Sequence, residues 1–180
     1  MNVRVIAGRF GGRVLDAPGR SSTHAMSERV RNALFNSINA ELDGAMVLDA
    51  FAGSGCVGIE AISRGASEAV FIEKDRIAAK IINKNLKLLR INETVINTTV
   101  SSWLETATSG PVFDIIFADP PYHDPQLGSV MRLERVLKPG GLLVVSHPSG
   151  VDVIPIEGIS LETTRSYGNA NLTLLRKAIG

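Results

Sequence analysis

The chain of 180 residues has a single cysteine, Cys56, and only three histidines. One cysteine excludes an internal disulfide and any zinc site built from several thiolates. His24, His123 and His147 lie far apart and do not form a metal-binding motif. We therefore expect no catalytic metal. Cys56 falls in a turn, where a small packing residue is more common than a nucleophile.

Long apolar runs are also absent. No stretch of about 18 apolar residues could span a bilayer, and the N-terminus, Met1-Asn2-Val3-Arg4, lacks the apolar segment of a secretory signal. We expect a cytoplasmic protein without membrane contact. Because 44 % of the residues are apolar, the chain can bury one substantial core. We expect residues 1–180 to form a single domain that acts as a monomer.

The net charge is small but unevenly distributed. The whole chain carries +1, whereas residues 1–31 hold six arginines against Asp16 and Glu28, so this part carries +4 and the remainder −3. Concentrated arginine is typical of a surface that contacts nucleic acid phosphates. The alternative is an arm that is merely solvated. The candidate phosphate contacts are Arg9, Arg13, Arg29 and Arg31.

Residues 1–43 predict a small basic extension made of a β-hairpin and a helix. Apolar stretches at 4–8 and 13–17, separated by two glycines, predict the hairpin. A helix is expected from a cap at Ser27 to about Leu42, because apolar residues recur every four positions. Arg29 and Arg31 lie outside this apolar stripe, so we expect both to be exposed. The stripe consists of Val30, Leu34, Ile38 and Leu42.

From residue 45 onwards, apolar runs alternate with amphipathic segments. This alternation is typical of an α/β fold with a doubly wound, open, mostly parallel sheet and helices on both faces. After Pro148 the helical periodicity ends, and two alternating segments predict a C-terminal antiparallel hairpin. The predicted strands are 45–49, 69–73, 94–97, 113–118, 142–146, 159–167 and 171–176. The predicted helices are 57–64, 76–89, 101–107 and 127–136, with a turn at 138–141.

A glycine-rich turn follows the first of these strands. It matches G-x-G-x-x-G between a strand and a helix, a pattern compatible with a dinucleotide or with S-adenosylmethionine. Asp49 would repel a pyrophosphate but attract the cationic amino acid part of S-adenosylmethionine. Glu73, at the end of the next strand, can accept both ribose hydroxyls of either ligand. The residues assigned to the cofactor are Asp49, Phe51, Ala52, Gly53, Ser54, Gly55, Glu73 and Lys74.

The strand at 113–118 runs into Asp119-Pro120-Pro121-Tyr122. Proline fixes φ near −65° and donates no N–H, so the turn is rigid and its carbonyls can face a ligand. Asp119 and the Pro120 carbonyl can accept from the exocyclic amine of a nucleobase while Tyr122 stacks on its ring. Taken alone, the four residues are equally compatible with a strand-end turn that carries a solvated carboxylate.

In their order along the chain, these motifs resemble the S-adenosylmethionine-dependent methyltransferases that modify exocyclic amines. Three N-terminal segments narrow the resemblance to the bacterial family that methylates the N2 amine of one guanine in 16S ribosomal RNA. The resemblance covers nearly the whole chain, including the final hairpin. It is carried by segments 49–55, 73–75 and 119–122, by 4–8, 12–13 and 28–36, and by Tyr167, Gly168 and Leu172.

The resemblance implies a Rossmann-like class I methyltransferase with S-adenosyl-L-methionine as cofactor and ribosomal RNA or a small-subunit assembly particle as partner. It also implies an adenine contact from Thr99 or from the backbone N–H of Val100, at a place where the family usually carries Asp or Asn. A second departure is His24-Ala25-Met26, which stands where the family commonly has Arg-Pro-Thr.

Other functions share parts of these motifs. A methyltransferase for adenine or cytosine amines of DNA or another RNA would use the same site, although the DNA enzymes usually add a target-recognition insert that is not visible here. Enzymes that methylate glutamine in release factors usually have Asn in place of Asp119. The remaining alternatives are a nonenzymatic RNA-binding module and a nicotinamide-dependent oxidoreductase.

Overall fold

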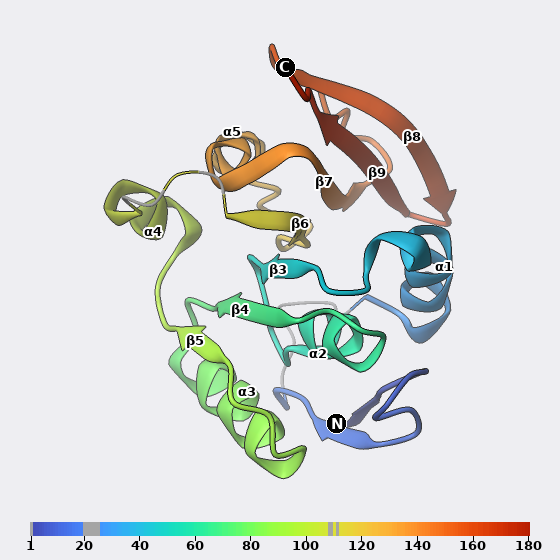
Figure 1. Cartoon of the computed structure of the whole chain (residues 1–180), viewed down its shortest axis with the longest axis vertical. Coiled ribbons are helices and arrows are strands. Elements are labelled where there is room, and N and C mark those ends of the chain that lie inside the picture. Colours follow the sequence, from blue (N-terminus) through green and yellow to red (C-terminus); the bar gives the residue numbers. More distant parts are fainter. Residues whose placement is uncertain (1, 20–25, 108–109, 111) are drawn as a thin grey trace.

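The computed structural model describes residues 2–19, 26–107, 110 and 112–180 (Figure 1). Its central seven-stranded sheet has the order β5-β4-β3-β6-β7-β9-β8. The first five strands in this order are parallel, and β9 runs antiparallel to both β7 and β8. The doubly wound sheet and its closing hairpin are thus confirmed. The strands are β3 (Met46–Asp49), β4 (Glu68–Ile72), β5 (Thr94–Ile96), β6 (Phe113–Ala118), β7 (Leu137–Pro148), β8 (Ile159–Tyr167) and β9 (Ala170–Lys177).

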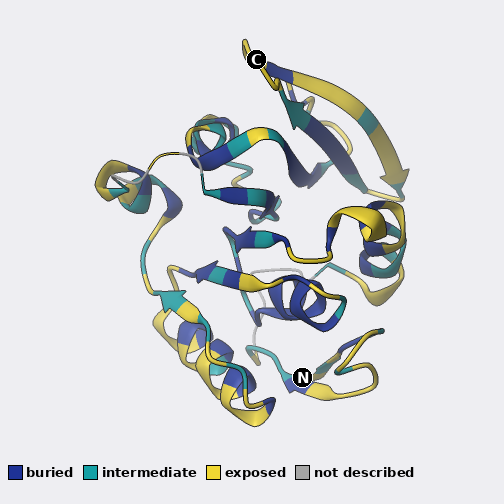
Figure 2. Ribbon diagram, viewed as in Figure 1, coloured by how far each residue is buried: buried dark blue, intermediate teal, exposed yellow. Residues whose placement is uncertain are grey.

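Helices cover both faces of this sheet (Figures 1 and 2). Successive side chains of a strand point to opposite faces. Ile115 of β6 therefore joins the core under α1 to α3, whereas Ile116 joins the core under α4 and α5. The helices are α1 (Glu28–Ile38), η1 (Asn39–Glu41), α2 (Cys56–Ser63), α3 (Arg76–Leu88), α4 (Val100–Thr106), α5 (Leu127–Arg132) and η2 (Leu133–Val136). Within the described ranges, no helix is both long enough and apolar enough to cross a bilayer.

The N-terminal hairpin is shorter than the sequence predicts. Its strands are β1 (Asn2–Arg4) and β2 (Val14–Asp16) rather than 4–8 and 13–17. The reason is that the N–H groups of Ile6 and Ala7 donate to the carboxylate of Glu60, at 2.9 and 3.1 Å, instead of pairing with β2.

The chain then turns at Gly8, where φ is +83°. A Cβ at this position would lie 2.0 Å from the carbonyl oxygen of Ser63, so only glycine fits. Residues 20–25, which include the His24-Ala25 pair, lie outside the described residues.

Arg31 corrects a second prediction. Its side chain is 1 % exposed, not on the surface. Its Nη2 donates to the carbonyl of Arg4 at 2.5 Å, and its Nε lies 3.6 Å from a carboxylate oxygen of Glu60. A phosphate contact from Arg31 is therefore wrong. Arg29, two residues earlier, is exposed as predicted.

Glu60 of α2, which forms the ion pair with Arg31, is fully buried. Its carboxylate also accepts from Nε of Arg64 at 2.8 Å, so two guanidinium groups face one carboxylate. The other nitrogens of Arg64 donate to Asn32 and Asn36 of α1, at 3.2 and 3.1 Å. Glu60 thereby fastens the N-terminal segment and α1 to α2.

One predicted turn lies inside a strand. Residues 138–141 fall within the bounds of β7, where a turn was expected before a strand at 142–146. The pairing with β6 nevertheless skips them, since Phe113 pairs with Leu137 and Ile115 with Leu142. The prediction of a turn at 138–141 is therefore wrong, although these residues do interrupt the pairing between β6 and β7.

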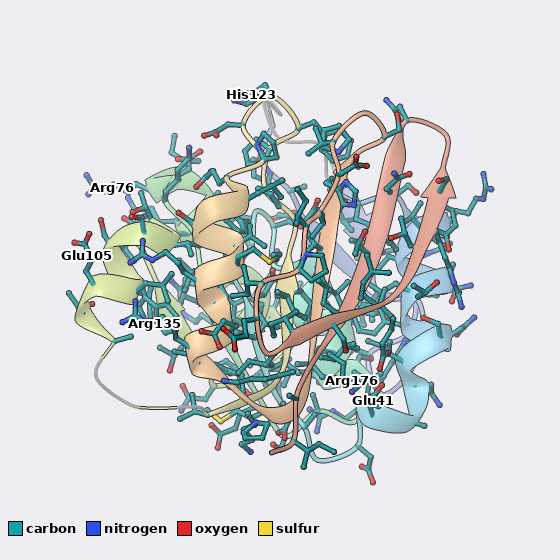
Figure 3. All side chains as sticks on the ribbon, turned by 90° about the horizontal axis from the view of Figure 1, so that it is seen from above. Glu41, Arg76, Glu105, His123, Arg135 and Arg176 are labelled. Carbon is teal, nitrogen blue, oxygen red and sulfur yellow. The ribbon has the colours of Figure 1, made fainter. Side chains whose placement is uncertain are left out.

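We expect Glu60→Ala to lower the free energy of unfolding by about 3–5 kcal/mol, because it leaves two guanidinium groups buried without their carboxylate. Urea denaturation would measure the change. Glu105→Ala, an exposed glutamate on α4 (Figure 3), is the control and should stay within about 0.5 kcal/mol of the unsubstituted protein. Equal effects of the two substitutions would contradict the role of Glu60.

Candidate active site

The site lies where the strand order reverses. β3 and β6 are parallel neighbours at the centre of the sheet, and the chain winds from β3 towards β5 on one side and from β6 towards β7 on the other. Ligands of open α/β sheets bind at the carboxyl ends of the strands at such a point. Four strands present polar residues at this edge, namely Asp49, Glu73, Asp119 and Ser146.

Asp49 fixes the start of α2. It is 2 % exposed, and its Oδ2 accepts from the backbone N–H of Gly58 at 2.9 Å. N–H groups in the first turn of a helix have no partner within the helix and attract anions. The carboxylate of Asp49 already fills that role, so a pyrophosphate would meet a negative charge there. The geometry favours S-adenosylmethionine over a dinucleotide.

The glycine turn is held on both sides. Gly53 and Gly55 have φ of +56° and +82°, and the N–H of Gly55 donates to the carbonyl of Ala52 at 2.7 Å. On the other side, the amide of Asn85 in α3 donates to the carbonyl of Ser54 at 3.0 Å. Asn85 is buried and absent from the predicted site, because an asparagine within an amphipathic helix gives no sequence signal of this contact.

Glu73 follows β4 at the same edge and is 8 % exposed. Within the described residues its Oε2 is buried and has no hydrogen-bond partner. A buried acceptor without a donor is costly, and the hydroxyls of a ribose would supply donors. Asn97, after β5, holds the backbone here by donating to the carbonyls of Glu73 and Lys74 at 2.8 and 3.1 Å. The Lys74 side chain itself is exposed.

Three carboxyl groups of this edge share one electrostatic environment. Burial raises the pKa of Asp49, of Glu73 and of Asp119 to about 7 in each case. The negative charges of Asp119 and Glu73 raise the pKa of Asp49 further, so the three groups lie close enough to interact. No group of three or more His, Cys, Asp or Glu within the described part of the chain could hold a metal ion.

Asp119 and Tyr122 converge on Ser146 at the end of β7. The Tyr122 hydroxyl lies 3.4 Å from Oγ of Ser146, and a hydrogen bond with Ser146 lowers the pKa of Asp119, against the effect of burial. A carboxylate only accepts, so Ser146 donates to Asp119 and its oxygen can accept from Tyr122. The sequence prediction did not include Ser146 in the site, although it is the first polar residue after the apolar run 142–145 of β7.

The predicted adenine contacts lie after β5. Thr99 caps α4 by accepting from the N–H of Ser102 at 3.1 Å, while the Val100 side chain is buried in the core. The N–H of Val100 belongs to the first turn of α4, where N–H groups lack partners within the helix. This arrangement favours the Val100 backbone over the Thr99 side chain. Phe51, half-buried, packs against the same core.

The hairpin arginines lie away from this edge. The N–H of Arg9 donates to the carbonyl of Ser63, the last residue of α2, and Arg13 Nη2 lies 3.5 Å from the carbonyl of Leu88, the last residue of α3. Both helices start at the edge that carries the carboxylates and end at the other. The structure thus does not bring Arg9 and Arg13 next to Asp119.

Comparison with known proteins identifies the relatives of this chain. The family model described as Conserved hypothetical protein 95 matches residues 3–176. Ribosomal RNA small subunit methyltransferase D of Haemophilus influenzae is 33 % identical over 172 residues, which cover 92 % of this chain and 89 % of that protein. The protein of the same name from Escherichia coli K12 is 38 % identical over 132 residues, 73 % of this chain and 66 % of that protein.

A solved structure agrees with this result. The Escherichia coli protein yhhF, described as a candidate methyltransferase, superposes with a TM-score of 0.87 at 32 % identity, covering 99 % of both chains. The class I methyltransferase fold and the family resemblance are confirmed. The chain therefore belongs to the family described as Conserved hypothetical protein 95 and is a methyltransferase.

Proposed function

We propose that the protein methylates the exocyclic N2 amine of a guanine in 16S ribosomal RNA, either as free RNA or within a small-subunit assembly particle, in the cytoplasm and as a monomer. The observation that carries the proposal is the Asp119-Pro120-Pro121-Tyr122 turn beside Asp49 and Glu73 at one sheet edge. The names of the bacterial relatives, ribosomal RNA small subunit methyltransferases, support RNA as the substrate.

S-adenosylmethionine supplies a methyl group bound to a positively charged sulfur. On this proposal, Glu73 accepts the ribose hydroxyls, and Asp49 faces the cationic amino acid part, directly or through water. The residues of the glycine turn provide backbone close to the ligand. The N–H of Val100 reads the adenine. Because S-adenosylmethionine is a cation, its binding also reduces the mutual repulsion of the buried carboxylates at the site.

The amine is positioned by the motif after β6. The Pro121 carbonyl accepts the N–H of Asp124 at 3.0 Å and closes the turn, so the Pro120 carbonyl is the one assigned to the substrate. Asp119 and Pro120 accept from the amine and localise the lone pair of its nitrogen, while Tyr122 stacks on the base. Pre-organised approach of this kind is worth about 7–11 kcal/mol, and Asp119 can take the released proton.

Tritiated methyl transfer to ribosomal RNA from cells that lack this enzyme tests the proposal. Nuclease digestion and mass spectrometry would identify the modified base, which we expect to be N2-methylguanine. Label on adenine or cytosine would assign the enzyme to another class of amine methyltransferases. RNA binding without transfer would indicate a binding module.

Asp119→Ala should reduce methyl transfer by roughly 100-fold or more, because both acceptance from the amine and proton removal are lost. Affinity for S-adenosylmethionine, measured by calorimetry, should be retained. Asp124→Ala, an exposed carboxylate in the same loop, is the matched control. An active Asp119→Ala variant would contradict the assigned role.

Binding of S-adenosylmethionine should release protons near pH 7. The carboxyls have a pKa of about 7 without ligand, and a bound cation favours their charged form, so their pKa falls on binding. Affinity should therefore rise as the pH increases from about 6 to 8. Calorimetry in buffers of different ionisation enthalpy measures the protons released, and proton uptake would show that the sign is wrong.

Ser146→Ala should move the acidic limb of the pH–rate profile to higher pH. The substitution removes the hydrogen bond that lowers the pKa of Asp119, so the carboxylate forms later as the pH rises. Turnover above about pH 8.5 should recover more fully than turnover at pH 7. Ser146→Thr, which keeps the hydroxyl, should restore the original profile. A uniform loss of rate at all pH values would indicate a purely structural role.

A further inference from the structure

The outer face of α3 carries an unusual set of charges. Four basic residues recur at spacings of four, four and three, which places them on one side of the helix, and all four are exposed. The 13 residues of α3 include no acidic residue. We call this set the α3 stripe; it consists of Arg76, Lys80, Lys84 and Lys87.

The net charge of the sequence does not reveal the α3 stripe. Residues 32–180 carry −3 in total. Because α3 alone contributes +4, the rest of that part carries −7. An average over the chain therefore assigns positive charge to the N-terminus only, whereas the fold shows a second basic surface on α3.

The arrangement is unfavourable for the isolated helix. Like charges at i and i+4 repel each other, and Arg76 places a cation in the first turn, where the helix dipole favours anions. Lys84 pairs with Asp16 of β2. The side chains of Arg76, Lys80 and Lys87 form no hydrogen bond or ion pair with any other residue that the structure describes. A solvated helix face usually mixes both signs, so these charges fit an external anionic partner better than solvent alone.

The stripe also connects two parts of the molecule. Arg76 lies towards the edge of the sheet that carries His123, just beyond Tyr122, whereas Arg176 and Glu41 lie at the opposite edge (Figure 3). At its other end, α3 meets the hairpin through Arg13 and Leu88. A helix of 13 residues is about 20 Å long. The stripe spans that length between the active-site edge and the hairpin arginines.

We propose that the α3 stripe binds the phosphate backbone of the RNA substrate and continues the hairpin surface of Arg9 and Arg13 to the active site. The inference rests on the proposed function, since it names the surface by which the same RNA is held. An RNA strand whose phosphates bind along α3 would run from the hairpin to the turn at Asp119. Arg13, exposed beside the last turn of α3, joins the two surfaces.

The test is the double variant Lys80→Gln/Lys87→Gln, which removes two exposed charges without breaking an ion pair among the described residues. The control is Arg132→Gln/Arg135→Gln on α5 and η2, which removes the same charge from the opposite face of the sheet. Binding to transcribed 16S ribosomal RNA is measured by fluorescence anisotropy over a series of salt concentrations. Calorimetry with S-adenosylmethionine shows that the cofactor site is intact.

We expect the α3 variant to bind RNA roughly tenfold more weakly at low salt and to reduce the slope of log K against log salt by about 2. Its KM for RNA should rise while kcat at saturating RNA is kept. Equal behaviour of the α3 variant and the unsubstituted protein would overturn the inference, as would an equal loss in the control. If the unsubstituted protein methylates RNA and the α3 variant binds RNA as tightly as it does, the proposed function stands and the inference about the α3 stripe is wrong. If the unsubstituted protein does not bind RNA, both fail.

Discussion

The carboxylate of Glu60 is the interaction on which the arrangement of this molecule depends. It is fully buried in α2, accepts hydrogen bonds from two backbone N–H groups and from Arg64, and forms an ion pair with Arg31. A buried charge is tolerated only when such partners surround it. Because α2 begins at the glycine turn, the same helix connects this turn to the N-terminal segment.

The active-site edge has the opposite character. There, burial raises the pKa values of Asp49, Glu73 and Asp119, and only for Glu73 does the charge of a cation, Lys74, act in the opposite direction among the described residues. Perturbed titration of this kind clusters at functional sites. Glu60 is satisfied by the protein itself, whereas Asp49, Glu73 and Asp119 would, under the proposed function, meet a ligand that brings positive charge and hydroxyl donors.

Most of the fold and half of the site follow from the sequence for one reason: the carboxyl ends of parallel strands meet at one edge. Asp49, Glu73 and Asp119 each follow an apolar run, so their proximity is predictable. Besides Ser146 of β7, the contacts that sequence reasoning missed join elements through single polar residues inside helices. Glu60 lies among apolar neighbours and Asn85 among lysines, and neither local pattern reveals a distant partner. The shortened hairpin and the buried Arg31 follow from the same omission.

Asn85 shows how narrowly one position can be constrained. Its Oδ1 accepts the N–H of Asp16, and its Nδ2 donates to the carbonyls of Asp16 and Ser54, with distances of 2.9 to 3.0 Å. Only a side-chain amide offers two donors and an acceptor in one small group. Aspartate would set oxygen against both carbonyls, and glutamine would need room for another methylene. In evolution, substitution at position 85 is therefore limited both by the basic hairpin and by the glycine turn.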